Sequence, residues 1–224
     1  MTLENQIAVR QEICRIGRML HGRGFVAGTD GNVSVRLSHD LVLCTPTSLC
    51  KGMMEPEDLV IVDLDGRQRN GTRHPSSELA MHLLFYSMRP EITAVVHAHP
   101  PTATGFAAAG ISLEEALVAE VVTALGKIPL ASYGMPGTHE LSDALRPLIP
   151  HHDAILMAHH GVVTCGHSLL RAYMNMECVE HYARVAFVAR QLGAQPLPEA
   201  EVRRLLEARE NYEANRPPVP VDWD

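Results

Sequence analysis

The sequence lacks the segments that carry proteins into or through a membrane. No apolar run in its 224 residues approaches the roughly 20 residues that a membrane-spanning helix needs. The N-terminal stretch MTLENQIAVRQEICRIG has the pattern of an amphipathic helix and contains no short apolar block of the kind found in signal peptides. We therefore expect a cytoplasmic protein with no membrane partner.

Cysteine pairs, basic patches and nucleotide loops are absent as well. The five cysteines are scattered without a CxxC pair, which is typical of reduced thiols and not of a disulfide framework. The net charge is −7, and the lack of any basic patch or arm argues against a nucleic-acid partner. Because neither GxGxxG nor GxxxxGK[ST] occurs, the phosphate loops of the large nucleotide-binding classes are excluded.

What the chain has in quantity is histidine. Its apolar content of 46% and charged content of 20% are ordinary for a globular protein, and its length allows one substantial core. Thirteen histidines, however, is a high count for this length. Because imidazole is the commonest metal ligand in proteins, the count directs the search toward a metal site.

Hydrophobic periodicity predicts one α/β domain over residues 1–215, followed by a Pro-rich tail at 216–224. Helices are predicted at 3–22, 76–88, 167–192 and 198–213. Strands are predicted at 32–37, 41–45, 58–66, 92–99 and 154–163. Because these strands do not alternate regularly with helices, the pattern favours a mainly antiparallel or mixed sheet layered with helices over a doubly wound nucleotide fold.

The HAH motif at the end of a predicted strand is the first candidate metal site. Residues two apart on a strand project to the same side, so His97 and His99 are spaced to share one ion. A third ligand must come from elsewhere, and LMAHHG offers one. There His159 and His160 end another apolar strand, and Gly161 allows close approach. Adjacent residues face opposite sides, so we expect only one of the pair to bind, and periodicity does not say which.

A metal site with an activity also needs a base. Glu78 lies in PSSELAMH, at the start of a predicted helix, where a carboxylate by itself commonly acts as a cap or dipole partner. The same stretch provides free N–H groups and the hydroxyls of Ser76 and Ser77. Together these groups form a good cradle for an anion.

Two glycine- and hydroxyl-containing loops are further anion-binding candidates. GTDGNVSVR surrounds Asn32 with glycines, and TPTSLCKG places Thr47 and Ser48 in a turn. Such loops are common individually. Three of them beside a metal constellation suggest a small, oxygen-rich substrate that carries a phosphate.

In their order along the chain, six blocks resemble the class II aldolase/adducin family, which includes L-fuculose-1-phosphate aldolase and L-ribulose-5-phosphate 4-epimerase. The blocks are GTDGNVSVR, TPTSLCKG, PSSELAMH, AVVHAHPPTA, PLASYGMPGT and AILMAHHGVV, which span roughly residues 28–166. The combination of HxH, a distant HHG and an intervening [ST]SE is specific.

The resemblance implies a single α/β domain with a central antiparallel sheet between helical layers. It implies a homotetramer with active sites at subunit interfaces and a divalent metal, usually Zn²⁺, although Mn²⁺, Co²⁺ and Fe²⁺ also accept three imidazoles. It implies cleavage of a ketose 1-phosphate to dihydroxyacetone phosphate and an aldehyde. The matching positions are His97, His99 and His160 as metal ligands, Glu78 and Tyr212 as catalytic groups, and Gly31, Asn32, Thr47, Ser48, Ser76 and Ser77 as phosphate-binding residues.

One departure from fuculose-phosphate aldolase bears on the substrate. That enzyme carries a tyrosine in the segment where this chain reads EEALVAEVVTALGKIPL, with Val118 and Glu120 nearest. The absence of this tyrosine fits aldolases of 5-deoxy- or 5-methylthio-ribulose 1-phosphate. It also allows a decarboxylase of a small hydroxy or aromatic acid on the same scaffold.

Two other branches of the family fit less well. The epimerase branch carries Asp where Glu78 stands, together with an extra acidic residue and a histidine pair that we do not find here. Non-catalytic members that serve as interaction domains have lost the metal site, whereas this chain keeps all three histidines and Glu78. Carbon–carbon cleavage is therefore favoured.

Overall fold

The computed structural model describes residues 3–214, with side chains from residue 4 to residue 208. The strands in this range are β1 (Asn32–Arg36), β2 (Leu41–Cys44), β3 (Val60–Asp63), β4 (Gln68–Asn70), β5 (Ala94–Ala98), β6 (Leu130–Ala131), β7 (Ala154–Met157) and β8 (Gly161–Gly166). The helices are α1 (Leu3–Gly22), α2 (Leu79–Met88), α3 (Pro101–Ala108), α4 (Ala119–Ala124), α5 (His139–Leu145), α6 (Leu169–Gln191) and α7 (Glu199–Ala214). The predicted tail at 216–224 lies outside the described residues.

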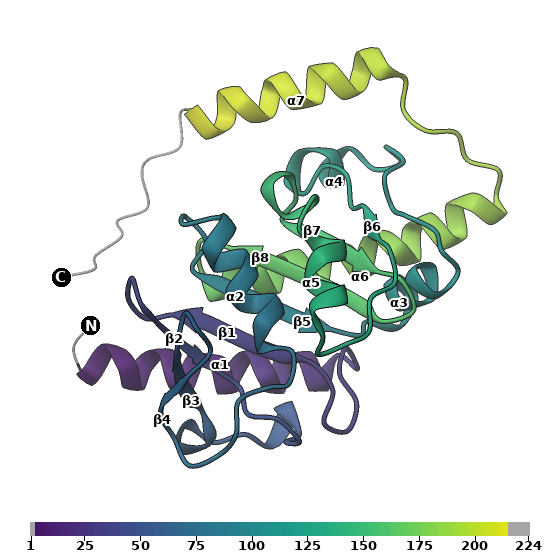
Figure 1. Cartoon of the computed structure of the whole chain (residues 1–224). Coiled ribbons are helices and arrows are strands. Elements are labelled where there is room, and N and C mark those ends of the chain that lie inside the picture. The colour runs from purple at the N-terminus through teal and green to yellow at the C-terminus, as the bar shows by residue number, and fades with distance from the viewer. Residues whose placement is uncertain (1–2, 215–224) are drawn as a thin grey trace.

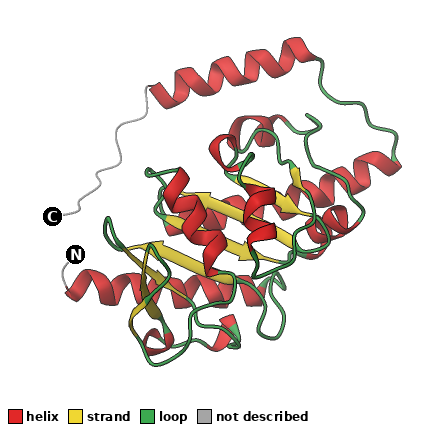
Figure 2. Cartoon of the chain, in the orientation of Figure 1, coloured by secondary structure: helices red, strands yellow, loops and turns green. Residues whose placement is uncertain are grey.

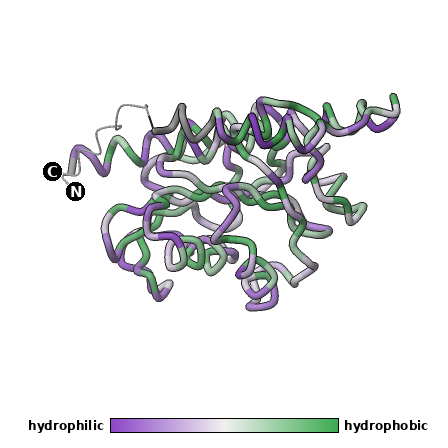
Figure 3. Tube along the Cα trace, turned by 90° about the horizontal axis from the view of Figure 1, so that it is seen from above, coloured by the Kyte–Doolittle hydropathy of each residue, from purple (hydrophilic) through white to green (hydrophobic). Residues whose placement is uncertain are grey.

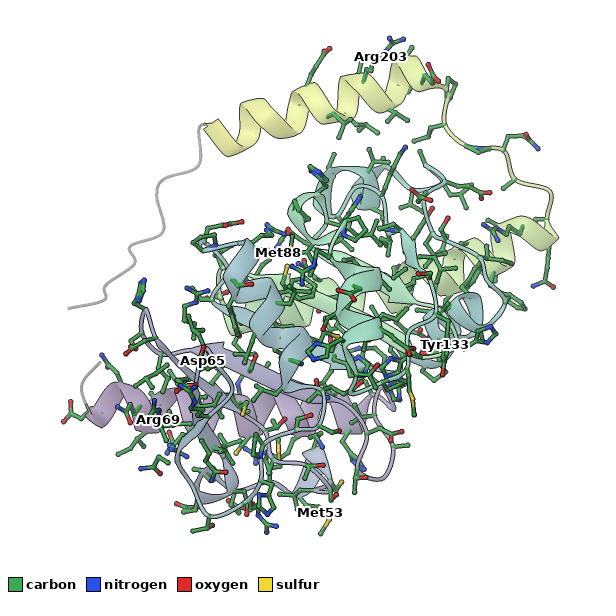
Figure 4. The ribbon with its side chains drawn as sticks, viewed as in Figure 1. Met53, Asp65, Arg69, Met88, Tyr133 and Arg203 are labelled. Carbon is green, nitrogen blue, oxygen red and sulfur yellow. The ribbon has the colours of Figure 1, made fainter. Side chains whose placement is uncertain are left out.

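All eight strands join in one sheet, in the order β4-β3-β2-β1-β5-β8-β7-β6. Every neighbouring pair is antiparallel except β6 and β7, which are parallel. The mainly antiparallel sheet predicted from the sequence is confirmed. The predicted turn at Asp65 and Gly66 joins β3 to β4, and Gly66 adopts the positive φ of 80° that glycine tolerates without a steric cost. In Figure 4, Asp65 and Arg69 mark this hairpin.

Helices cover both faces of the sheet and create two apolar cores (Figures 1 and 2). Helices α1, α3 and α6 pack on one face, and α2 and α5 pack on the other. Strand β1 serves both sides because its side chains alternate. Val33 and Val35 join the core under α1 and α6, whereas Ser34 contacts Tyr86 on α2. Figure 3 shows the molecule turned by 90°, with hydrophobic and hydrophilic stretches alternating along the trace.

The prediction of one strand over 154–163 was wrong. Residues 158–160 form a tight turn between β7 and β8, closed by the backbone N–H of His160 on the carbonyl of Met157 at 3.0 Å. His159 takes a positive φ of 55° there. The continuous apolar run concealed this hairpin because both of its strands are buried on both faces. Short elements that the periodicity did not predict are β4, β6, α3, α4 and α5.

The C-terminal helix α7 lies across one end of the molecule, beside α4 (Figure 1). The predicted long helix stops as expected, since α6 ends just before Gly193 with its φ of 72°. In Figure 4, Arg203 points away from the body of the protein. Within residues 3–214, none of the helices combines the length and the apolar character needed to cross a membrane.

Candidate active site

The site forms where strand β1 faces helix α2. Asn32 and Ser34 are two apart on β1 and therefore point to the same face of the sheet. Glu78, His82 and Tyr86 are spaced four apart and therefore line one side of α2. The polar side chains of the strand therefore face the polar side chains of the helix in a buried layer between β1 and α2.

The three histidines predicted as ligands converge on one point beside this layer. His97 lies opposite Asn32 in the β1–β5 register, and His99 follows the end of β5. The ring centroids of His97, His99 and His160 are 4.7 to 5.3 Å apart. One nitrogen of each ring lies within 4.8 Å of the others, which suits ligation of a single ion. Of the adjacent pair, His160 is the one that joins the group.

His159 points elsewhere. Its ring contacts the exposed Tyr133 at 6.4 Å between centroids, on the loop after β6 that Figure 4 shows at the edge of the molecule. The turn holds His160 close to the end of β5, because Gly161 packs against it. A Cβ on Gly161 would lie 2.5 Å from a carbon of the His99 ring, so only glycine fits there.

The hydrogen bonds of two of the histidines leave their inner nitrogens bare. His97 Nδ1 donates to the carbonyl of Val162 at 2.9 Å, so the neutral ring carries its lone pair on Nε2. His99 Nδ1 faces Asp30 Oδ2 at 3.4 Å, which again leaves Nε2 bare. These two Nε2 atoms are 3.1 Å apart. Two lone pairs cannot satisfy one another, whereas a cation between them satisfies both. The donor set therefore fits a divalent metal.

The charge state of His99 is also suited to binding a divalent metal. Burial lowers the pKa of His99 to about 4, and the neighbouring His97 and His160 lower it further in the same direction. A neutral His99 has one bare nitrogen to offer. The buried Nδ1 of His160 also has no hydrogen-bond partner among the described residues.

Glu78 lies between the histidines and the start of α2. Its Oε2 is 3.2 Å from His97 Nε2, and its Oε1 is 3.1 Å from His160 Nε2. Burial raises the pKa of this carboxyl, but its contacts with the side chains of His97 and His160 outweigh burial and hold the pKa well below its usual range. Glu78 is the helix N-cap residue, yet its side chain makes no capping hydrogen bond. The alternative interpretation of Glu78 as a capping side chain is therefore not supported, and its catalytic role stays a prediction.

A chain of buried polar contacts leads from Glu78 into the protein. Asn32 Nδ2 donates to Glu78 Oε2 at 2.9 Å, and Asn32 Oδ1 contacts His82 Nε2. Ser34 Oγ lies 2.7 Å from His82 Nδ1 and 2.8 Å from the hydroxyl of Tyr86. The sequence analysis left His82 unassigned. The i, i+4 spacing of Glu78, His82 and Tyr86 is the signal that could have grouped them.

The three predicted anion cradles surround one polar cavity of about 200 Å³. It is lined by Thr29, Asp30, Gly31, Asn32, Pro46, Thr47, Ser48, Lys51, Ser76, Ser77, Glu78 and His99. All six predicted phosphate-binding residues are in this lining, together with Glu78 and one of the three histidines.

Backbone contacts hold the cavity walls together. The N–H of Thr47 donates to the carbonyl of His74 at 3.0 Å, and the N–H of Ser76 donates to the carbonyl of Thr45 at 3.2 Å. Gly31 has a φ of 71°, and a Cβ there would lie 2.8 Å from the carbonyl of His97. The glycine is thus required for the loop to approach the metal-binding strand.

Lys51 is a cavity residue that the sequence analysis missed, although it quoted TPTSLCKG. The side chain is 1% exposed, and Nζ donates to the carbonyls of Thr29 and Leu49 at 2.9 and 2.5 Å. Burial lowers the pKa of Lys51. Backbone carbonyls, and not a carboxylate, therefore hold this cation at the wall of the cavity.

Two other candidates have different outcomes. Tyr212 belongs to α7, but its side chain lies outside the described residues, so its role stays a prediction. Glu120 is exposed on α4 and is not among the described residues that line the cavity.

Residues 11–187 of the chain match the model of the class II aldolase and adducin N-terminal domain. The chain belongs to this family. It is 34% identical to 3-oxo-tetronate 4-phosphate decarboxylase of Escherichia coli K12, over 85% of this chain and 90% of that protein. It is also 34% identical to 5-deoxy-D-ribulose 1-phosphate aldolase of Bacillus thuringiensis, over 91% of this chain and 96% of that protein.

A solved structure of L-fuculose 1-phosphate aldolase superimposes with a TM-score of 0.84, at 31% identity over 91% of this chain and 96% of that one. The predicted family and fold are thereby confirmed. Relatives with equal identity are named for two different reactions, so likeness by itself leaves the specific activity open.

Proposed function

We propose that the protein is a metal-dependent lyase that cleaves a ketose 1-phosphate to dihydroxyacetone phosphate and an aldehyde. One observation carries the proposal: the carboxylate of Glu78 contacts two of the three clustered histidines at the edge of a polar cavity. A base, a metal-binding group and an anion-sized cavity are the parts that this reaction needs. A 5-deoxy- or 5-methylthio-ribulose 1-phosphate, or a fuculose-phosphate-like sugar, is the expected substrate.

His97, His99 and His160 would hold the metal, with zinc as the expected ion because three neutral imidazoles with open positions are a typical catalytic zinc set. The metal, when bound, supplies a Lewis acid for the substrate's carbonyl and neighbouring hydroxyl oxygens. Glu78 would remove the proton from the substrate hydroxyl next to the bond that breaks. It would then give a proton to the carbon left on the dihydroxyacetone phosphate part. Tyr212 would donate a hydrogen bond to the oxygen of the departing aldehyde and keep its own proton.

The phosphate is placed in the cavity between the three loops. Thr47, Ser48, Ser76 and Ser77 provide hydroxyls, and the start of α2 provides backbone N–H groups. Lys51 adds the positive charge that a phosphate dianion needs beside Glu78 and Asp30. Binding the phosphate firmly keeps the reacting carbons beside the histidines.

Decarboxylation on the same scaffold is the second candidate. No tyrosine lines the cavity among the side chains described, from residue 4 to residue 208. Loss of carbon dioxide starts from a carboxylate that is already ionised, so it needs no base for the cleavage step. Glu78 would then only relay a proton from water to the product carbon. The relative named 3-oxo-tetronate 4-phosphate decarboxylase makes a phosphorylated oxo acid the first compound to test.

A homotetramer in the cytoplasm remains our expectation for the working protein. The site is open at the surface, since Thr47, Ser48 and Ser77 are exposed in the single chain. A neighbouring subunit would complete and cover it. Sedimentation velocity on the purified protein would test this expectation.

A coupled assay for dihydroxyacetone phosphate decides between the two reactions. The panel contains fuculose, rhamnulose, 5-deoxyribulose and 5-methylthioribulose 1-phosphates, each with and without chelator and added zinc. Metal-dependent release is expected from at least one of them. Carbon dioxide release from 3-oxo-tetronate 4-phosphate, with no aldol product from the panel, would replace the aldolase proposal with the decarboxylase.

A further inference from the structure

We propose that His82 is a positioning residue, which fixes the amide of Asn32 in the one orientation that holds Glu78 and presents an N–H to the cavity. Its relevance to catalysis rests on the proposed role of Glu78 as acid and base. The inference comes from the buried contacts among Asn32, Ser34, His82 and Tyr86, whose hydrogens can be arranged in only one way.

The arrangement starts at Glu78. Asn32 Nδ2 donates to Glu78 Oε2 at 2.9 Å. This contact fixes the direction of the Asn32 amide, because only the nitrogen of that amide can donate a hydrogen bond. Asn32 Oδ1 then faces His82 Nε2. Because a carbonyl oxygen only accepts, His82 must carry a hydrogen on Nε2.

The remaining hydrogens follow from the neutral state of His82. The ring is 2% exposed, and burial lowers its pKa to about 3. A neutral ring with a hydrogen on Nε2 has a bare Nδ1, so Ser34 Oγ donates to it at 2.7 Å. Ser34 Oγ in turn accepts from the Tyr86 hydroxyl at 2.8 Å. Burial raises the pKa of Tyr86 well above its ordinary value, so that hydroxyl keeps its proton. Each hydroxyl and ring N–H of Ser34, His82 and Tyr86 thus has an acceptor.

This series of hydrogen bonds prevents the Asn32 amide from rotating by 180°. A turned amide would place its carbonyl against the Glu78 carboxylate and its NH₂ group against the N–H of His82. Two hydrogen bonds would become two repulsions in a buried site, where unsatisfied polar groups are costly. In the observed orientation Asn32 keeps a second N–H, and Asn32 lines the cavity where a substrate oxygen would lie. His82 itself is not part of the cavity lining.

Two amide substitutions separate positioning from packing. The side-chain nitrogen of Gln can occupy the place of His Nε2, whereas the shorter Asn reaches only the place of Nδ1. His82→Gln can still donate to Asn32, and His82→Asn can only contact Ser34. With equal zinc content and cooperative unfolding, we expect kcat to stay within about threefold of wild type for His82→Gln. We expect a fall of about 10- to 100-fold for His82→Asn, the effect of one lost hydrogen bond at a charged group.

A second readout does not depend on turnover. Nitrogen-15 spectra of the imidazoles, with the His82 signal assigned by its loss in His82→Gln, should show a neutral ring carrying hydrogen on Nε2 between pH 6 and 8. Ser34→Ala removes the donor to Nδ1 and should increase the population with hydrogen on Nδ1. This variant serves if either His82 variant fails to fold.

The outcomes distinguish the two proposals. A ring with hydrogen on Nδ1 in the wild type, or equal kcat values in folded His82→Gln and His82→Asn, would overturn the positioning role. Absence of carbon–carbon cleavage by zinc-loaded wild type, with the Nε2 hydrogen observed, would overturn the proposed function and leave the hydrogen-bond chain intact.

Discussion

Strand β1 has two faces with different tasks. Val33 and Val35 lie in an apolar core under α1 and α6, where apolar substitutions of similar volume are tolerated best. Asn32 and Ser34, on the other face, each have defined hydrogen-bond partners on α2. The apolar face stabilises the fold through burial. The polar face contributes less stability per residue but specifies one geometry, which the site requires.

The largest effect is expected from removing a metal ligand beside the polar face of β1. His97→Ala should abolish zinc binding and activity, a larger effect than the roughly 10- to 100-fold that loss of an outer-shell partner costs. The fold should persist because the apolar face is untouched. Zinc content by mass spectrometry and product release measure the result, and the exposed His39→Ala is the matched control. Full zinc content and activity in His97→Ala would exclude the site.

Glu78→Gln separates metal binding from proton transfer. The amide retains the shape of the side chain but cannot take a proton, so kcat should fall by about 10²- to 10⁴-fold. Zinc content should stay at the wild-type level because the three histidines remain. Activity close to wild type would show that another group is the base.

Substitution on the apolar face should lower stability and leave kcat unchanged. Leu43 is fully buried opposite Val35, and Leu43→Ala should lower the free energy of unfolding by about 2–5 kcal/mol. Urea denaturation measures this loss, with the exposed Ile7→Ala as control. Below the unfolding transition kcat should be unchanged. A selective loss of kcat in the folded variant would mean that the two faces are not independent.

Lys51 tests the charge of the cavity wall. Lys51→Met keeps the length of the side chain and removes the charge, so binding of inorganic phosphate should weaken by about 10- to 100-fold, as for loss of one hydrogen bond to a charged group. Isothermal titration calorimetry gives the Kd. Lys127 is exposed, and Lys127→Met should leave the Kd unchanged. Unaltered phosphate binding in folded Lys51→Met would restrict Lys51 to joining the two backbone loops.

The sequence was most informative where the two-residue repeat of a strand determines the side to which a side chain points. The direction of His97 and His99 follows from alternation along one strand. The antiparallel arrangement was predicted because the strands do not alternate regularly with helices. The choice between His159 and His160 depends on a three-residue turn with a positive φ, which alternation along a single strand cannot describe. The identification of the phosphate-binding positions came from family resemblance, and the cavity lining includes all six.

What sequence reasoning missed required contacts between distant segments. His82 acquires a role only because β1 lies beneath α2, at a separation of 50 residues from Asn32. Lys51 is buried because its nitrogen reaches the carbonyl of Thr29, 22 residues away. A histidine or lysine in isolation is most often a solvated side chain, and only the assembled fold reveals which ones are enclosed.

The smallest expected effect is a difference in pH dependence between wild type and His82→Gln. Burial holds the pKa of His82 at about 3 in the folded protein, below its ordinary value of 6.5. The unfolded chain therefore binds a proton near pH 6.5 that the folded chain does not. The stability contributed by His82 is complete above pH 6.5 and is lost progressively as the pH falls toward 3.

The free energy of unfolding should consequently fall more steeply on acidification in wild type than in His82→Gln. The expected difference is up to about 1.4 kcal/mol per pH unit, which corresponds to one proton. Urea unfolding at pH 7, 6 and 5, with both proteins metal-free so that the other histidines contribute equally, measures it. Parallel slopes would show that His82 is protonated in the fold. A protonated ring would donate from both nitrogens and reverse the Ser34 and Tyr86 hydrogen bonds, so the polar face would no longer specify a single arrangement.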